Sequence, residues 1–135
     1  MVLSESDKSR DFIKKQKKLH GKHLKIEKII RPDKSGEPDI FAIYKGMPVY
    51  MEAKYINPIS MKNTHPFTLI QLDTLKTNAN AGAMCIGLLH CSKSTRFIMY
   101  DKLTEYLDRD AVESAQEFQW QTLLLLWMAN IQTNF

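Results

Sequence analysis

Hydrophobic residues dominate two short runs in the first half of the chain, and charged residues interrupt these runs at only three positions. The first run is PDIFAIY (38–44) and the second is MPVYMEAK (47–54). Both are rich in β-branched and aromatic residues, and only Lys45-Gly46 separates them, which is typical of a β-hairpin with a two-residue turn. We therefore predict an antiparallel hairpin over residues 38–55.

The register of this hairpin brings its charged residues together. If Tyr44 faces Met47 across the turn, Asp39 lies directly opposite Glu52, with Cβ atoms roughly 5 Å apart. Side chains two positions apart on a strand share a face, so Lys54 lies beside Glu52. Two carboxylates and an ammonium group are therefore expected to converge.

Apolar periodicity predicts a basic helix over residues 4–20, before the hairpin, with Ser4 as its N-cap. Its inward stripe includes Phe12, Ile13 and Leu19. Glu5 falls on the same side of this helix. It either points toward the hairpin carboxylates or only stabilises the first turn of the helix through the helix dipole.

The remaining patterns predict further strands and helices. Leu24 to Ile30 is an opening strand, and Phe67, Ile70, Leu72 and Leu75 form the apolar stripe of a helix that ends near Gly82. Strands follow at Ala83 to Leu89 and Arg96 to Tyr100, and residues 101–132 form a helical region. The element order αβββαβ indicates an α/β fold, a mixed central sheet flanked by helices, in one domain over residues 1–135.

The last helix has a wider apolar surface than a helix with one face in water. Its apolar residues are Trp120, Leu123 to Met128 and Ile131. It either covers the sheet or pairs with a second copy of the chain.

The net charge of +4 is unevenly distributed. Residues 1–34 carry eleven Lys and Arg against five acids, whereas residues 101–135 carry two against six. A basic segment of this kind either contacts a phosphate backbone or is a solvated helix face. The candidate DNA-binding residues are Lys14, Lys15, Lys17, Lys18, Lys22, Lys25, Arg31 and Lys34.

No apolar run has transmembrane length and the N-terminus lacks the plan of a signal peptide, so we expect a cytoplasmic protein with no membrane partner. Cys85 and Cys91 fit no zinc or disulfide pattern and are expected to be reduced. The four histidines are expected to be exposed or to contact phosphate, among them His90 at a strand end.

Opposed carboxylates destabilise a sheet unless something neutralises them, and a hard divalent cation such as Mg²⁺ does so. Such a cation beside Lys54 polarises a phosphodiester and lowers the pKa of a bound water. The alternative is a solvated hairpin face with ordinary surface charges.

Pro38-Asp39, the short hairpin and Glu52-Ala53-Lys54, within the order αβββαβ, resemble the PD-(D/E)xK nuclease superfamily with its restriction-endonuclease-like core. Within it, Gly46 and the later helix bearing Gln71 make the chain similar to the RecU type of Holliday junction resolvase and to the small archaeal resolvases, over roughly Leu24 to Leu103. The chain lacks room for the stalk of RecU enzymes and looks like a minimal version, of the kind that phages encode.

The resemblance implies roles for individual residues. Asp39, Glu52 and the Ala53 carbonyl would bind Mg²⁺, with Mn²⁺ as a substitute and no organic cofactor. Lys54 would hold the attacking water or the scissile phosphate, and Gln71 would position water or metal. Glu5 parallels an acid that many members place on the first helix.

The expected activity is an endonuclease that resolves branched DNA as a homodimer, by paired nicks that leave 5′-phosphates. Two alternatives remain: a flap, nicking or restriction-type nuclease on the same core, and a basic DNA-binding protein without catalytic activity.

Overall fold

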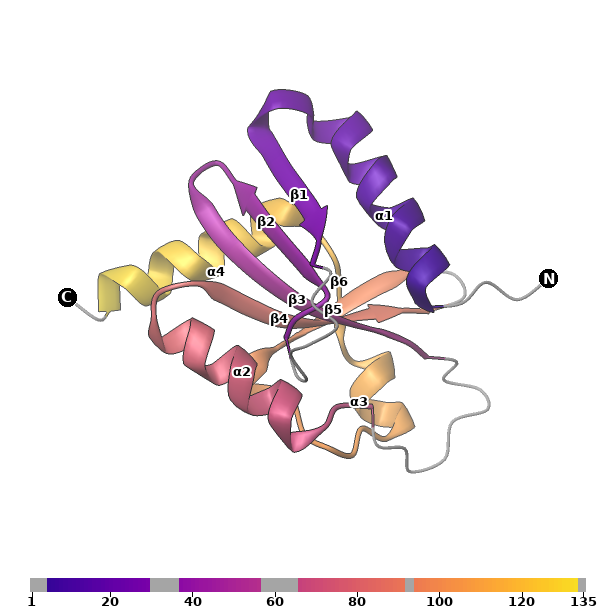
Figure 1. Cartoon of the computed structure of the whole chain (residues 1–135). Coiled ribbons are helices and arrows are strands. Elements are labelled where there is room, and N and C mark those ends of the chain that lie inside the picture. Colours follow the sequence, from indigo (N-terminus) through magenta and orange to yellow (C-terminus); the bar gives the residue numbers. More distant parts are fainter. Residues whose placement is uncertain (1–4, 30–36, 57–65, 92–93, 134–135) are drawn as a thin grey trace.

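One six-stranded sheet forms the centre of the molecule (Figure 1). The computed structural model describes residues 5–29, 37–56, 66–91 and 94–133. The strands lie in the sheet in chain order: β1 (Leu24–Lys28), β2 (Ile40–Tyr44), β3 (Met47–Tyr55), β4 (Met84–His90), β5 (Thr95–Met99) and β6 (Gln116–Glu117). Only β3 and β4 pair in parallel, and the other neighbours are antiparallel.

The helices are α1 (Glu5–His20), α2 (Leu69–Asn80), α3 (Arg109–Glu113) and α4 (Trp120–Thr133), with 3-10 turns at η1 (Gly21–His23) and η2 (Tyr100–Lys102). The first six main elements therefore follow the order αβββαβ, and the prediction of a mixed sheet flanked by helices is confirmed. The predicted Ser4 cap lies outside the described residues. Of the helices described, none has both the length and the apolar character needed to cross a membrane.

The β2–β3 hairpin has the predicted register, with Tyr44 opposite Met47 and Ile40 opposite Met51. Its turn residues Lys45 and Gly46 have φ values of 48° and 86°. Positive φ at both central positions is what a type I′ turn requires, and the backbone twist of this turn matches the twist of the strands.

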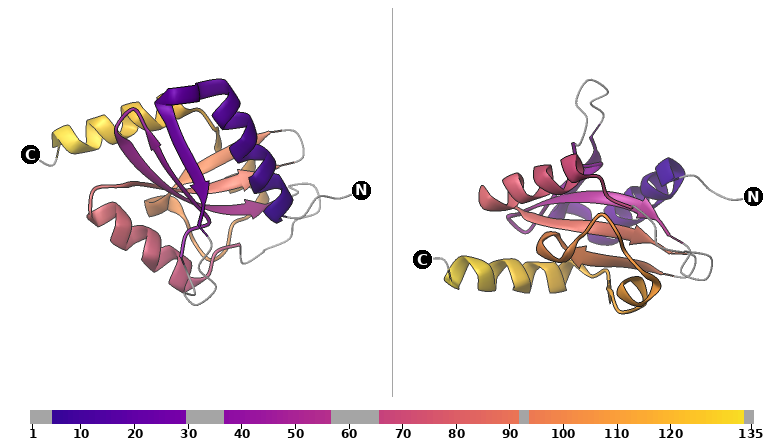
Figure 2. Two further views of the ribbon diagram at one scale, coloured as in Figure 1. Left: turned by 45° about the horizontal axis from the view of Figure 1, so that its top comes forward. Right: turned by 90° about the horizontal axis from the view of Figure 1, so that it is seen from below.

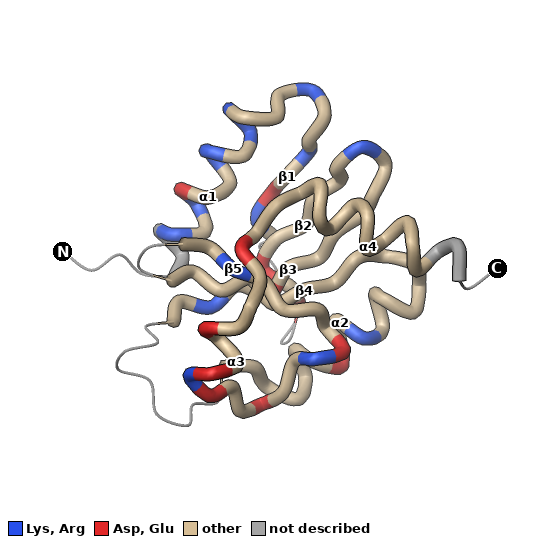
Figure 3. The backbone as a smooth tube through the Cα atoms, turned by 180° about the vertical axis from the view of Figure 1, so that it is seen from behind, with Lys and Arg blue, Asp and Glu red and all other residues tan. Residues whose placement is uncertain are grey.

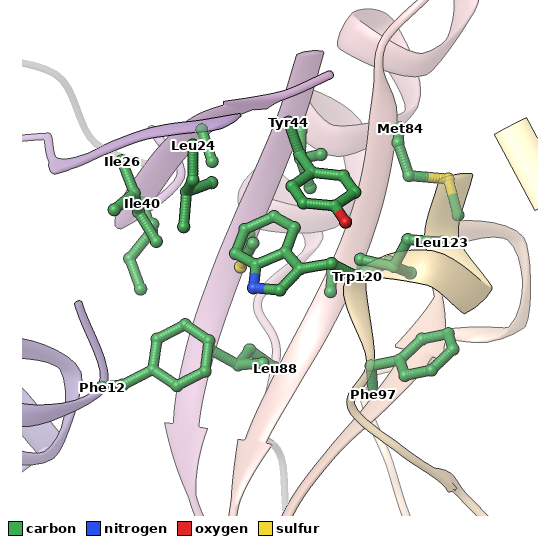
Figure 4. Packing of buried hydrophobic residues seen from close by; sticks show 14 of the residues in the cluster. Phe12, Leu24, Ile26, Ile40, Tyr44, Met84, Leu88, Phe97, Trp120 and Leu123 are labelled. Atoms are coloured by element: carbon green, nitrogen blue, oxygen red, sulfur yellow. The ribbon is translucent and has the colours of Figure 1, made fainter. Parts of the chain in front are cut away.

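Two hydrophobic clusters lie on opposite faces of the sheet, and Figure 2 shows α2 and α4 on different sides of it. The first cluster joins α1 and α4 to the sheet, and Figure 4 shows Trp120 at its centre. The Trp120 ring stacks on Tyr44, with ring centroids 5.4 Å apart, and its Nε1 donates to Oε1 of Gln16 at 2.8 Å. This hydrogen bond satisfies the amide oxygen of Gln16 on the buried side of α1. Leu19, predicted to point inward, is instead 64% exposed.

The second cluster lies under α2 and α3 and includes Phe67, Leu75, Leu89 and Val112. Strand β4 is buried along its whole length because both clusters cover it. That continuous burial is typical of a central strand with a parallel neighbour.

The prediction of a helical region over residues 101–132 is wrong in part, because the short strand β6 lies between α3 and α4 and residues 103–108 are not helical. Arg96 Nη1 donates to the carbonyl oxygens of Val112 and Glu113 at the end of α3. The chain then pairs with β5, with Glu117 opposite Arg96. Tertiary contacts with β5 therefore end the helical run that local pattern favours.

Helix α4 covers the sheet with Trp120 and Leu123, which confirms one of the two readings of its apolar surface. Leu125, Leu126 and Met128 remain exposed on its other side.

Candidate active site

Asp39 and Glu52 are placed by the hairpin at the end remote from its turn. Asp39 directly precedes β2, and its carbonyl oxygen accepts a hydrogen bond of 2.8 Å from the N–H of Ile29, which continues the β1–β2 ladder. Continuing the register beyond Ile40 and Met51 pairs Asp39 with Glu52. Glu52 is 3% exposed, and Asp39 is half-buried.

The Asp39 carboxylate contacts the backbone of β3 beside Glu52. The N–H of Ala53 donates to Oδ2 of Asp39 at 2.9 Å. Because the N–H and C=O of one strand residue point to the same neighbour, the Ala53 carbonyl is directed to the same edge of β3 as Asp39. Two carboxylates and one backbone carbonyl therefore belong to one site.

Gln71 reaches this site from the first turn of α2. Its Nε2 donates to Oε1 of Glu52 at 2.8 Å. Hydrogen bonds to a carboxylate favour its charged form and fix its orientation. The structure thus brings together Asp39, Glu52, Ala53 and Gln71.

Lys54 follows Glu52 on β3 and is half-buried. Its Nζ lies 5.9 Å from the ring centroid of Phe67, at the outer limit of a cation–π contact. Phe67 is 1% exposed, so it offers the Lys54 stem a fixed apolar wall.

The groups of this site that could coordinate a metal ion are carboxylate and carbonyl oxygens. Oxygen ligands suit Mg²⁺ better than a softer metal. Among the described residues, no group of three or more His, Cys, Asp or Glu side chains is arranged to hold a metal ion. A cation at this place would have the two carboxylates, the Ala53 carbonyl and water available as ligands. Mg²⁺ fits such a set because it keeps several of its waters.

The side chain of Glu5 lies outside the described part of the structure, so its predicted role stays a prediction. Its backbone opens α1, and one turn later Lys8 Nζ lies 4.8 Å from the ring centroid of Tyr55. The first turns of α1 are therefore near the C-terminal end of β3, the end that carries Glu52.

Lysines and arginines lie along α1 and on β1 (Figure 3), and all of them but the half-buried Lys8 are exposed. The C-terminal end of α1 lies at the hairpin turn, where the N–H of Lys45 donates to the carbonyl of His23. From that turn to Glu52 is roughly 17 Å along β3. The exposed candidates are Lys14, Lys15, Lys17, Lys18, Lys22 and Lys25, while Arg31 and Lys34 lie outside the described residues.

His90 differs from its predicted exposure, because it is 4% exposed beneath α1. Its Nε2 is 3.3 Å from Oγ of Ser9, and Phe12 packs edge-on against the ring. Burial, with a smaller contribution from the positive charge of Lys8, lowers the pKa of His90 to about 4. His90 is therefore a neutral core residue at pH 7.

Both cysteines are free thiols, as predicted. Burial raises the pKa of Cys85 to about 12 and also raises the pKa of Cys91. Neither thiol is a nucleophile at neutral pH.

Sequence reasoning missed Thr68, which caps α2 and contacts Gln71. The spacing Thr68-x-x-Gln71 is a capping-box signature and identifies this helix start. It also missed Gly87, the parallel partner of Glu52 on β4, whose missing side chain leaves room for Phe67.

The sequence matches no protein-family model and no curated protein. Among solved structures, the fold is similar to that of Hjc from Archaeoglobus fulgidus, a Holliday junction resolvase from an archaeal hyperthermophile. The two chains are 19% identical, the similarity covers 81% of this chain and 92% of that chain, and the TM-score is 0.63. The α/β sheet that carries Asp39 and Glu52 therefore has the fold of a small Holliday junction resolvase, as the PD-(D/E)xK resemblance predicted.

Proposed function

We propose that this chain is a divalent-metal-dependent DNA endonuclease that cuts four-way junctions and leaves 5′-phosphates. The observation that carries the proposal is the convergence of Asp39, Glu52, the Ala53 backbone and Gln71 on a fold similar to that of a resolvase. Neither the fold nor the carboxylate pair would be sufficient without the other.

Each residue has a defined task in this reaction. Asp39, Glu52 and the Ala53 carbonyl hold Mg²⁺, which when bound polarises the phosphodiester and lowers the pKa of a water. Gln71 keeps Glu52 oriented through its 2.8 Å hydrogen bond. Lys54 stabilises the charge that develops on the phosphate oxygens. Water attacks phosphorus in line with the 3′ oxygen, the P–O3′ bond breaks, and that oxygen takes up a proton.

Resolution of a junction requires two symmetric cuts, so the proposed active species is a twofold homodimer. The exposed apolar residues Leu125, Leu126 and Met128 of α4 support an interface on that side of the molecule. The lysines of α1 contact the DNA arms at a distance from the cut.

The first test is strand-by-strand cleavage of labelled four-way, flap, nicked and linear DNAs with Mg²⁺, using the wild type and Glu52→Gln. We expect paired nicks in the four-way junction only, with 5′-phosphate ends. Glu52→Gln keeps the size of the side chain but loses its charge, and should lower the cleavage rate by at least about 100-fold while junction binding persists.

The matched control is Glu117→Gln, which changes an exposed acid on β6 and should cut like the wild type. Undiminished cleavage by Glu52→Gln would contradict the proposed site. Equal cleavage of linear and four-way DNA would favour a nuclease of another kind on this core. Tight DNA binding without any cleavage by the wild type would favour the binding protein without catalytic activity.

A further inference from the structure

The start of α2 is built around two reciprocal hydrogen bonds. Thr68 is the N-cap, with φ −82° and ψ 160°, and its Oγ1 accepts from the N–H of Gln71 at 3.1 Å. In return, Oε1 of Gln71 accepts from the N–H of Thr68 at 2.9 Å. This pair of bonds is a capping box, which satisfies two of the donors that a helix start leaves open.

The capping box also determines which end of the Gln71 carboxamide faces the sheet. The N–H of Thr68 can only donate, so it requires the amide oxygen, and the amino group is then directed to the Glu52 carboxylate. The reverse orientation would place two donors together and an amide oxygen against a carboxylate. Only one orientation of the amide satisfies both neighbours.

The residue before the cap anchors this helix start beside Glu52. The Phe67 ring packs over Gly87, the residue that pairs with Glu52 on the neighbouring strand. A Cβ at position 87 would lie 2.7 Å from Cζ of Phe67. The cap therefore stands at a fixed position on the sheet.

We propose that Thr68 is a positioning residue of the carboxylate site: through the capping box it holds the Gln71 amide in the orientation that donates to Glu52. The metal-binding part of this inference rests on the proposed function, whereas the orientation of Gln71 does not. Thr68 itself is exposed and contacts neither carboxylate, so its effect passes entirely through Gln71.

A cap that only stabilised its helix would lower stability and leave Gln71 unchanged. The chain offers a matched control in Asp108, the N-cap of α3, whose Oδ1 accepts from the N–H of Ala111 at 2.8 Å. Thr68→Gly and Asp108→Gly each remove one capping side chain. Glycine is tolerated at an N-cap, so both variants should fold, and Thr68→Ala is a second variant of the same kind.

The experiment measures the ¹⁵N NMR signal of the Gln71 side-chain amide in metal-free protein. The signal is assigned as the one that is missing from the spectrum of Gln71→Met. In the wild type and Thr68→Ser, we expect the Gln71 side-chain amide protons to exchange slowly with solvent. We also expect their chemical shift to differ from that of exposed glutamines, because of the hydrogen bond to Glu52. Thr68→Gly keeps the backbone N–H that donates to Oε1 of Gln71 but loses the Oγ1 that holds the Gln71 backbone, so both values should move toward those of exposed glutamines, while Asp108→Gly keeps the wild-type signal.

The second readout is Mn²⁺ binding by calorimetry. Loss of an outer hydrogen-bond partner weakens metal binding by roughly tenfold or more, so Thr68→Gly should bind Mn²⁺ that much more weakly and Asp108→Gly should bind as the wild type does. An unchanged Gln71 signal in both Thr68→Gly and Thr68→Ala would overturn the inference. If the wild type binds no Mn²⁺ and cuts no DNA, the proposed function fails, and the amide signal alone then decides the role of Thr68.

Discussion

Gly87 shows how closely the second cluster is packed around the carboxylate site. Its absent side chain leaves room for Phe67 and Leu103, which come from different segments of the chain. The position is on β4, a strand buried on both faces, so the neighbours have little freedom to move.

Gly87→Ala should lower the free energy of unfolding by about 1–3 kcal/mol, because an added methyl overpacks the cluster. The new Cβ would lie 2.7 Å from Phe67 Cζ and 2.8 Å from Leu103 Cδ2. Urea unfolding measures the change. Adding Phe67→Leu to Gly87→Ala shortens the obstructing side chain and should recover part of the loss, and a single variant as stable as the wild type would contradict this packing.

His90 makes stability depend on pH. Its pKa is about 4 in the folded protein against an ordinary value of 6.5, so below pH 6.5 the unfolded chain binds a proton that the folded chain does not. The stability present above pH 6.5 is therefore lost as pH falls toward 4, by up to about 3 kcal/mol from this residue.

His90→Gln should remove that part of the loss, seen as a smaller difference between urea unfolding at about pH 7 and about pH 4.5. His23→Gln, which replaces an exposed histidine, is the control. The same pH dependence in His90→Gln and the wild type would show that carboxylates alone cause it.

These residues also show what a sequence can predict. Asp39 and Glu52 were predictable because a two-residue turn dictates the register, and register is a local property. The burial of His90 was not, because its contact with Ser9 joins residues 81 positions apart and depends on how α1 packs on the sheet.

At the scale of elements, the turn of the β2–β3 hairpin sets the strand register that places Asp39 opposite Glu52. Gly46 has φ 86°, a conformation that a side chain disfavours, and nothing lies within 4 Å of where its Cβ would be. The constraint at this position is therefore in the backbone and not in packing.

Gly46→Ala should lower the free energy of unfolding by about 1 kcal/mol, through backbone strain alone. Lys45→Asn should be neutral or stabilising, because Asn tolerates the positive φ of 48° at that position. Urea unfolding of the two variants tests both statements, and an unaffected Gly46→Ala would exclude strain at the turn.

Prediction failed where tertiary contacts override local pattern. Residues 101–132 have helical periodicity, yet Gln116–Glu117 pair with β5 and divide the region. The αβββαβ core was predictable because turn residues mark the ends of its elements. The apolar stripe predicted for α2 was wrong in part, because Phe67 precedes the helix and Ile70 is 54% exposed.

Across the whole molecule, the exposed lysines at the end of α1 are separated from the carboxylate site. The last turn of α1, with Lys17 and Lys18, lies toward the hairpin turn, and acidic residues gather around α3 (Figure 3). A phosphate backbone that contacts the end of α1 must extend roughly 17 Å along β3 to reach Glu52. The proposed substrate is therefore held over several nucleotides and cut at one end of that length.

Lys17→Gln with Lys18→Gln should weaken junction binding and reduce the slope of log affinity against log salt by about 0.9 for each phosphate that the protein no longer neutralises. Lys76→Gln with Lys102→Gln removes the same charge from exposed positions on α2 and η2 and is the control. Equal effects of the two pairs would show that only net charge matters. Binding titrations at several salt concentrations provide the measurement.

The Gln71–Glu52 hydrogen bond spans 19 positions and exists only when α2 has docked on the sheet, whereas the Asp39–Ala53 bond forms within the hairpin. A nascent or partly folded chain can thus close the hairpin while Glu52 still lacks the donor that orients it. Under the proposed function, DNA cutting becomes a property of the completed tertiary structure. A nuclease built in this way does not cut nucleic acid while the nuclease is still only partly folded.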